Sequence, residues 1–324
     1  MRAGVLVLGP LLAKYGVAKV SLPGGCAIGS RPIDLHLSAL KKMGAKVKIK
    51  DGYVTASAKN GLKGCLIKFP KISVGATENA LIASCFAKGT TKLRNCATEP
   101  EVKDLIYFLK KSGCKINWIG DRGLNITGVV DLKPIKYNVI FDRIEAGTYI
   151  IAAALTQGKL KINNIDPKVI LTEINILRKM GANIIIKKTH LQINCSKKIK
   201  CIDIETAPYP GFPTDLQAQI MVLMIQAEGI SKIKEKIFEN RFMHVSELRR
   251  MGAQIEIKGN EAKIFGKRKL NGAELMATDL RASVSLVLAG LVAKNKTTLH
   301  RIYHLDRGYE DIEKKLSNCG ANIR

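Results

Sequence analysis

The chain has 324 residues, of which 46% are hydrophobic and 5% aromatic, and its formal net charge is +26. A single hydrophobic core stops growing at roughly 250–300 residues, so this length predicts two domains, which we place at residues 1–139 and 140–324. No run approaches the ~20 apolar residues that a membrane helix needs, which excludes a membrane-spanning helix.

The chain opens with an apolar segment, residues 1–24, which we predict to form a helix followed by a short strand. The segment could be mistaken for a secretory signal peptide, but it aligns with residues 280–301, with Arg2 opposite Arg281. Residue 1 then falls in the middle of a repeated unit. We therefore expect an N-terminal part to be missing, either because the chain is a fragment or because an internal methionine was taken as the start.

A glycine-rich loop follows, residues 22–36 (LPGGCAIGSRPIDLH). Cysteine is usually buried and inert, but the neighbours of Cys26 supply no bulk with which to bury it. Two interpretations are open. Cys26 is either a surface-loop cysteine without a role or a reactive thiol on a loop that can close over a ligand.

The motif Leu-x-x-x-Gly-(Ala/Cys)-x-(Val/Ile) recurs along the rest of the chain. Its glycines are 68 to 71 residues apart, at Gly44, Gly113, Gly181, Gly252 and Gly320. Each copy predicts an amphipathic helix, a glycine in the left-handed conformation that ends it, and a strand rich in lysine and isoleucine.

A helix rich in small residues and a short strand precede each motif, as in residues 76–95, 146–164, 215–235 and 279–301. With a leading strand such as 65–69, each unit reads βαβαββ and is about seventy residues long. We predict an α/β fold in which about five of six such units are present, three of them in the second domain.

Four blocks carry the remaining motifs: residues 22–36; 71–77 (KISVGAT); 211–219 (GFPTDLQAQ) with 238–245 (FENRFMHV); and 277–283 (ATDLRAS) with 301–313 (RIYHLDRGYEDIE). Together they resemble the enolpyruvyl transferases, and within them the UDP-N-acetylglucosamine 1-carboxyvinyltransferases. The resemblance implies two domains of βαβαββ units, an inside-out α/β barrel, with the active site between them. It also implies the first committed step of peptidoglycan synthesis, in which phosphoenolpyruvate and UDP-N-acetylglucosamine give the enolpyruvyl ether and phosphate.

The resemblance assigns two catalytic residues. Cys26 is the general acid at C3 of phosphoenolpyruvate and the target of fosfomycin, and we expect Arg31 to lower the pKa of its thiol. Asp215 is the carboxylate at the attacking sugar hydroxyl. From the residues alone, Thr214 and Asp215 form an ordinary helix N-cap, and both roles can coexist.

The resemblance also implies two sets of binding residues. Those for phosphoenolpyruvate are Arg31 and Arg307. Those for UDP-N-acetylglucosamine are Arg2, Arg31, Pro32, Ile33, Asp34, Leu35, Lys71, Ile72, Ser73, Val74, Asp215 and Ile237. Arginine suits both ligands because its planar fork matches carboxylate and phosphate.

Other polar residues in the matching blocks have structural interpretations. Arg241 and Arg281 suit an ion pair as well as a substrate contact, and we expect His36, His244 and His304 to be structural. The eight cysteines include no C-x-x-C pair, so we predict no metal site and, as the location, a reducing cytoplasm. We also predict no cofactor.

Three alternatives remain. A related branch acts on shikimate 3-phosphate but lacks the Pro-Gly-Gly-Cys loop. A non-catalytic remnant of a split gene would need a complementing N-terminal fragment, because a lysine–asparagine pair of the family lies in the missing unit. We expect this chain alone to bind substrate poorly and to turn over little.

The third alternative is a nucleic-acid-binding protein, which the charge suggests. The excess lysines are spread over turns and helix faces, with no basic tail. We therefore expect small-molecule substrates, with neither nucleic acid nor membrane as a partner.

Overall fold

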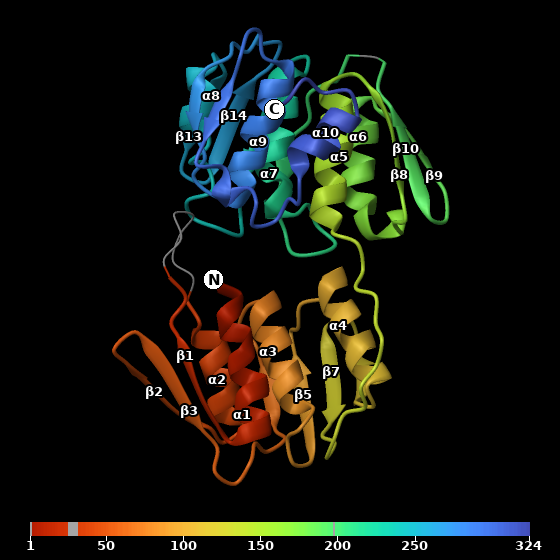
Figure 1. The fold of residues 1–324 in the computed structure, drawn as a ribbon. Coiled ribbons are helices and arrows are strands. Elements are labelled where there is room, and N and C mark those ends of the chain that lie inside the picture. The colour runs from red at the N-terminus through yellow and green to blue at the C-terminus, as the bar shows by residue number, and fades with distance from the viewer. Residues whose placement is uncertain (1, 25–31, 197) are drawn as a thin grey trace. The chain divides into compact units, whose positions relative to one another are not determined.

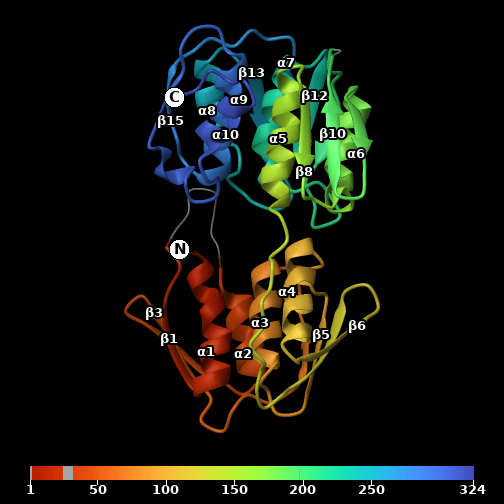
Figure 2. The ribbon, with the colours of Figure 1, turned by 45° about the vertical axis from the view of Figure 1, so that its right-hand side comes forward.

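The computed structural model describes residues 2–24, 32–196 and 198–324. The chain divides into two compact units, unit 1 up to Ile140 and unit 2 from Phe141 onward. Both units are α/β, with helices gathered side by side and sheets around them (Figures 1 and 2).

The described residues of unit 1 form two sheets. One is three-stranded and antiparallel, in the order β1-β3-β2, and the other is four-stranded, in the order β4-β5-β7-β6. The elements of unit 1 are η1 (Arg2–Val7), α1 (Leu8–Tyr15), β1 (Val17–Ser21), α2 (Asp34–Lys42), β2 (Lys46–Lys50), β3 (Tyr53–Ser57), β4 (Leu66–Lys68), α3 (Val74–Ser84), β5 (Thr90–Arg94), α4 (Pro100–Lys111), β6 (Lys115–Ile119) and β7 (Gly123–Thr127).

In the described part of unit 2 the strands form three sheets, in the orders β8-β10-β9, β11-β12-β14-β13 and β15-β16. Its elements are α5 (Arg143–Leu155), β8 (Lys159–Asn163), η2 (Pro167–Ile170), α6 (Leu171–Met180), β9 (Asn183–Ile186), β10 (His190–Asn194), β11 (Ile204–Glu205), η3 (Thr214–Leu216), α7 (Gln217–Gln226), β12 (Ile230–Lys234), α8 (Val245–Arg250), β13 (Gln254–Lys258), β14 (Glu261–Phe265), β15 (Glu274–Met276), α9 (Leu280–Val292), β16 (Thr298–His300), η4 (Ile302–His304) and α10 (Ile312–Asn318).

The repeated glycines have the predicted conformation. Their φ angles are 95°, 106°, 111°, 96° and 96°, in chain order, and each follows the end of an amphipathic helix. A side chain at these positions would be strained, which explains why every copy uses glycine. A strand follows four of the five glycines, whereas the residues after Gly320 form none.

The βαβαββ pattern is complete in two places, from β4 to β7 and from β11 to β14. The unit that begins with α5 lacks its leading strand, because residues 128–142 cross from unit 1 to unit 2 without strand hydrogen bonds. The expectation of a full unit there was wrong.

Each unit has its own hydrophobic core, and its small-residue helices lie inside it. Helix α7 is buried from Gln217 to Ile225, so it packs on all sides rather than along one stripe. Among the described residues, no helix is both long and apolar enough to cross a membrane.

Candidate active site

Asp215 lies in the single 3-10 turn η3, directly before the buried helix α7. Pro213 is the N-cap residue of this turn, and Leu216 is that of α7. The prediction that Thr214 and Asp215 cap the helix is therefore wrong, because the chain enters the helix through this extra turn. The Thr214 hydroxyl instead donates to Glu235 Oε2 over 2.9 Å.

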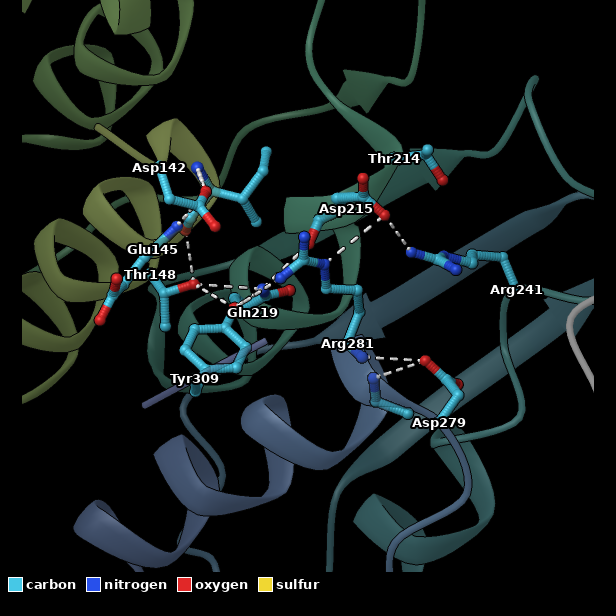
Figure 3. A network of polar contacts seen from close by, with 12 residues as sticks. Asp142, Glu145, Thr148, Thr214, Asp215, Gln219, Arg241, Asp279, Arg281 and Tyr309 are labelled. Atoms are coloured by element: carbon cyan, nitrogen blue, oxygen red, sulfur yellow. Dashed lines mark hydrogen bonds and ion pairs between the residues drawn. The ribbon is translucent and has the colours of Figure 1, made fainter. Parts of the chain in front are cut away.

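A buried arginine, Arg241, and a half-buried one, Arg281, hold the Asp215 carboxylate (Figure 3). Arg241 Nη2 donates to Oδ1 of Asp215 over 2.7 Å, and the Arg241 side chain is only 4% exposed. Arg281 Nε lies 3.7 Å from the same oxygen. The Asp215 side chain is itself 42% exposed, so the carboxylate is fixed from within the protein and accessible from outside.

Arg281 is oriented by the start of α9. Asp279 caps this helix by accepting from the backbone N–H groups of Arg281 and the next residue, over 2.9 and 3.2 Å. Burial alone would lower the pKa of Arg281, but the negative charge of Asp215, with Tyr309 and Asp142, outweighs burial and raises that pKa. Arg281 therefore remains a cation beside Asp215.

Tyr309 connects Arg281 to the core of unit 2. Arg281 Nη1 donates to the Tyr309 hydroxyl over 3.3 Å, and that hydroxyl lies 2.9 Å from Thr148 Oγ1. Because the Thr148 hydroxyl donates to the carbonyl of Ile144, over 2.8 Å, the Tyr309 hydroxyl must donate to Thr148. The hydrogen bonds therefore run in one direction, from Arg281 to Tyr309 to Thr148.

Gln219 connects this series of hydrogen bonds back to Asp215. Its Nε2 donates to the carbonyl oxygen of Asp215 over 2.9 Å and lies 3.3 Å from Thr148 Oγ1 and 3.4 Å from the Tyr309 hydroxyl. We call Asp215, Arg281, Tyr309, Thr148 and Gln219, with Arg241, the Asp215 network. It joins α5, α7, α9 and the segment that carries Tyr309 (Figure 3).

Glu235 fixes the backbone at Ile237, shortly before Arg241 of the Asp215 network in the sequence. Glu235 Oε1 accepts from the backbone N–H groups of Ile237 and Phe238, over 2.7 and 3.1 Å, while Oε2 accepts from Thr214. The Ile237 side chain is exposed, which suits the apolar ligand contact predicted for it.

Two further residues of unit 2 differ in accessibility. Arg307 is exposed, two residues before the buried Tyr309, so the network anchors the segment that carries it. His244 is buried, and burial lowers its pKa to about 4. It is neutral at pH 7 and inaccessible to a ligand, as expected of a structural histidine.

The predicted nucleotide-sugar residues of unit 1 divide by burial. Ile33 and Leu35 are buried in the core, so only their backbone could contact a ligand, whereas Pro32 and Asp34 are exposed. Ile72, Ser73 and Val74 are half-buried, and Lys71 is exposed. The Ser73 hydroxyl caps α3 by accepting from the backbone N–H of Ala76 over 3.4 Å.

Three predicted site residues cannot be placed against these. Cys26 and Arg31 lie outside the described residues. Arg2 belongs to η1, but its side chain is likewise outside the described part. Within the described residues, no three His, Cys, Asp or Glu side chains gather as ligands for a metal ion.

The comparisons with known proteins agree with the repeated fold. Residues 1–316 match the family model of EPSP synthase (3-phosphoshikimate 1-carboxyvinyltransferase). The chain belongs to this family of enolpyruvyl transferases.

Within the family, the chain is similar to proteins named UDP-N-acetylglucosamine 1-carboxyvinyltransferase. It is 66% identical to that of Pelagibacter ubique and 56% identical to that of Rickettsia prowazekii, over the whole chain and 78% and 77% of those proteins. Among solved structures, it is similar to the enolpyruvyl transferase NikO from Streptomyces tendae, with a TM-score of 0.88 and 28% identity over 98% of this chain and 76% of that one. EPSP synthase from Acinetobacter baumannii has the same fold, with a TM-score of 0.76 and 20% identity over 99% of this chain and 78% of that one.

The sequence indicated some residues of the Asp215 network and missed others. Asp215, Arg241 and Arg281 lie in the blocks that carry the resemblance, and Gln219 follows Asp215 by four residues, a spacing that predicts neighbours on a continuous helix. Tyr309 also lies in a quoted block but carried no assignment. Thr148 had no signal, since a threonine inside a helix of small residues resembles any other packed residue.

Proposed function

We propose that this enzyme transfers the enolpyruvyl group of phosphoenolpyruvate to the 3′-hydroxyl of UDP-N-acetylglucosamine, with release of phosphate. The 66% identity to a protein of that name, over the whole chain, carries the proposal. The Asp215 network supports it, because the reaction needs a fixed, accessible carboxylate.

The reaction is an addition followed by an elimination. The sugar hydroxyl loses its proton and forms a bond to C2 of phosphoenolpyruvate, while C3 gains a proton. In the second step C3 loses a proton, the C2–O bond to phosphate breaks, and the enolpyruvyl ether remains. The protein must therefore supply an acid at C3 and an acceptor at the hydroxyl.

Asp215 is the acceptor in this proposal. Arg241 and Arg281 meet at one of its oxygens, Oδ1, which fixes the direction of the carboxylate. Two adjacent positive charges stabilise the ionised form, which accepts a hydrogen bond from a hydroxyl group. Cys26 is the acid at C3.

The remaining predicted residues bind the two anionic substrates. Arg31 and Arg307 contact phosphoenolpyruvate, and the nucleotide sugar contacts residues 32–35 and 71–74, Arg2 and Ile237. The N-terminus of α3, where Ser73 caps the helix, supports a phosphate position because helix N-termini attract anions. A reducing cytoplasm is the proposed location, since it keeps the Cys26 thiol free.

Two measurements on the chain test this function. The first is ligand-detected NMR, which registers weak binding, with UDP-N-acetylglucosamine and shikimate 3-phosphate compared at equal concentration. We expect only UDP-N-acetylglucosamine to bind, because the relatives at 66% and 56% identity are transferases named for that substrate. Selective binding of shikimate 3-phosphate would instead favour the other branch of the family.

The second is treatment with fosfomycin in the presence of UDP-N-acetylglucosamine, followed by peptide mass spectrometry. Cys201 and Cys319 are exposed free thiols, so they are internal controls for nonspecific alkylation. The proposal requires an adduct at Cys26 that is absent from both controls and from Cys26→Ser protein. Labelling of Cys201 and Cys319 with Cys26 unmodified would contradict the assignment of the acid.

A further inference from the structure

The sequence Thr-Asp-Leu occurs twice in unit 2, each time at the start of a small-residue helix. The copies are residues 214–216, directly before α7, and residues 278–280, at the start of α9. In the second copy, Asp279 is the N-cap residue of α9 and accepts from two backbone N–H groups of its first turn (Figure 3). In the first copy, Asp215 is the N-cap residue of neither η3 nor α7. The same three residues therefore direct their carboxylates differently.

The threonines of the two copies also differ in their contacts. The Thr278 hydroxyl oxygen is buried and has no hydrogen-bond partner among the described residues. The Thr214 hydroxyl donates to Glu235 Oε2 over 2.9 Å. The Thr214 carbonyl accepts from the N–H of Gln217, the group that an aspartate cap at the preceding position would otherwise bind. The turn η3 thus replaces the cap that the second copy has.

Glu235 is a rigid partner for Thr214. It directly follows β12, and its relative exposure is 2%. Its backbone N–H and C=O are both hydrogen bonded to Asn260, over 2.8 and 2.9 Å. Its second carboxylate oxygen, Oε1, accepts from the backbone N–H groups of Ile237 and Phe238. One buried carboxylate therefore holds both the turn η3 and the segment that carries Ile237.

The internal repeats show that the fold alone does not require a glutamate at this position. After the corresponding strands β5, β8 and β16, the next residue is Asn95, Asn164 or Arg301, with φ angles of 58°, 58° and 59°. These residues are in the left-handed region, whereas the φ of Glu235 is not positive. The repeat that contains β12 therefore departs from the others at the residue that binds Thr214.

We propose that Thr214 and Glu235 are positioning residues, whose hydrogen bond holds the turn η3 and so keeps Asp215 out of the helix cap. The Asp215 carboxylate is then directed to Arg241 and Arg281 and is accessible to the sugar hydroxyl. Without this bond, the segment would take the arrangement of its second copy, in which the carboxylate binds N–H groups of its own helix. This inference rests on the proposed function, because it concerns the acceptor in that reaction.

The test is the affinity of Thr214→Val for UDP-N-acetylglucosamine and for UDP, measured by ligand-detected NMR on the folded chain. Valine keeps the shape of threonine but removes the hydroxyl. We expect binding of UDP-N-acetylglucosamine to weaken about fivefold, because a carboxylate in the helix cap cannot receive the sugar hydroxyl. The affinity for UDP, which lacks the sugar, should stay within about twofold of the parent chain. A general structural defect would weaken the binding of both ligands.

Two variants are the controls for this measurement. Thr214→Ser keeps a hydroxyl that can donate to Glu235, so it should bind both ligands as the parent chain does. Thr278→Val removes the hydroxyl of the second copy, which has no partner in the described part of the chain, so it should also bind both ligands normally. Amide hydrogen exchange of α7 and α9 shows that each variant is folded.

A double-mutant cycle tests the part of Glu235. In Glu235→Ala protein the Thr214 hydroxyl has lost its acceptor, so adding Thr214→Val should change the affinity for UDP-N-acetylglucosamine by less than about twofold. A further loss of about fivefold in that background would show that Thr214 acts through another group, and would overturn the assignment of Glu235.

The failure of this inference can be distinguished from the failure of the proposed function. If the parent chain binds UDP-N-acetylglucosamine and Thr214→Val binds it equally well, or loses UDP to the same extent, the positioning role is wrong and the proposed function stands. If the parent chain does not bind UDP-N-acetylglucosamine, the proposed function fails and the positioning role fails with it.

Discussion

The two units use the same kind of buried helix for different purposes. In unit 1, Asn79 on α3 donates to the carbonyl of Val5 over 3.0 Å and hydrogen bonds to Nδ1 of His36, also over 3.0 Å. These contacts are buried. In unit 2, the equivalent helices carry the Asp215 network, which contains three charged side chains and ends at an accessible carboxylate.

The difference indicates how one cluster of a repeated fold only holds helices together while another can also contact a substrate. Both clusters join helices of small residues through an amide side chain, Asn79 or Gln219. The unit 2 cluster extends to charged groups, among them the accessible carboxylate of Asp215. The following predictions test this contrast, from the largest expected effect to the smallest.

Gly9→Ala should destabilise unit 1 more than any other change considered. A Cβ at Gly9 would overlap Asn79 Oδ1 and lie 2.7 Å from the Asn79 backbone oxygen, which cannot move away. We expect a loss of about 3 kcal/mol in the free energy of unfolding. Trp118, the single tryptophan, lies on β6 of unit 1, so its fluorescence in urea reports this loss.

Gly147→Ala in unit 2 is the matched control. Its Cβ would overlap Leu216 Cδ1, the end of a flexible side chain that can shift. We expect a loss of about 1 kcal/mol, measured by amide hydrogen exchange of α5. Equal losses for the two variants would show that the helices of unit 1 are not the more tightly packed.

Glu78→Gln should stabilise unit 1 at high pH. Burial, with repulsion from Glu101 and Glu99, raises the pKa of Glu78 to about 7. The folded state then holds a proton that the unfolded state loses, so stability falls as pH rises from about 4.5 to about 7, by up to about 3 kcal/mol. Trp118 fluorescence should show this fall in the parent chain and a flatter profile in the variant.

His244 should give unit 2 the opposite pH dependence. Burial lowers its pKa to about 4; the negative charge of Asp279 acts against that shift and the positive charge of Arg241 adds to it. The unfolded state therefore binds a proton first as pH falls, and stability declines between about 6.5 and about 4, by roughly 3 kcal/mol. Hydrogen exchange of α8 checks this, and a decline of unit 2 toward high pH would contradict it.

Tyr309→Phe should have a small effect on stability. It removes the hydroxyl that accepts from Arg281 and donates to Thr148, while the ring remains buried. We expect a loss of about 1–2 kcal/mol in unit 2, seen as faster hydrogen exchange in α5 and α9. Tyr107→Phe, at an exposed tyrosine of unit 1, should change neither helix.

Much of the fold was predictable because it depends on local patterns. The five glycines marked helix ends, and their φ angles confirm it. The small-residue helices were also predicted with their strands. The absence of a leading strand before α5 was not predicted. Residues 128–142 connect the two units there, and they form no strand.

The site was less predictable because its contacts are long-range. Thr148 and Tyr309 are 161 residues apart in sequence, and no local pattern indicates that their hydroxyls meet. The role of Thr214 was missed for a similar reason. Its partner Glu235 lies on the far side of α7 and β12 in the sequence, and the local signal resembled a helix cap.

The most direct test of the account is the affinity of Asp215→Asn for UDP-N-acetylglucosamine, measured by ligand-detected NMR. The amide keeps the shape of the side chain but removes the charge that Arg241 and Arg281 hold in place. We predict binding about tenfold weaker than in the parent chain, with Asp306→Asn, at an exposed carboxylate of the same unit, within about twofold of the parent. Unchanged affinity in Asp215→Asn would contradict the claim that this carboxylate receives the sugar hydroxyl.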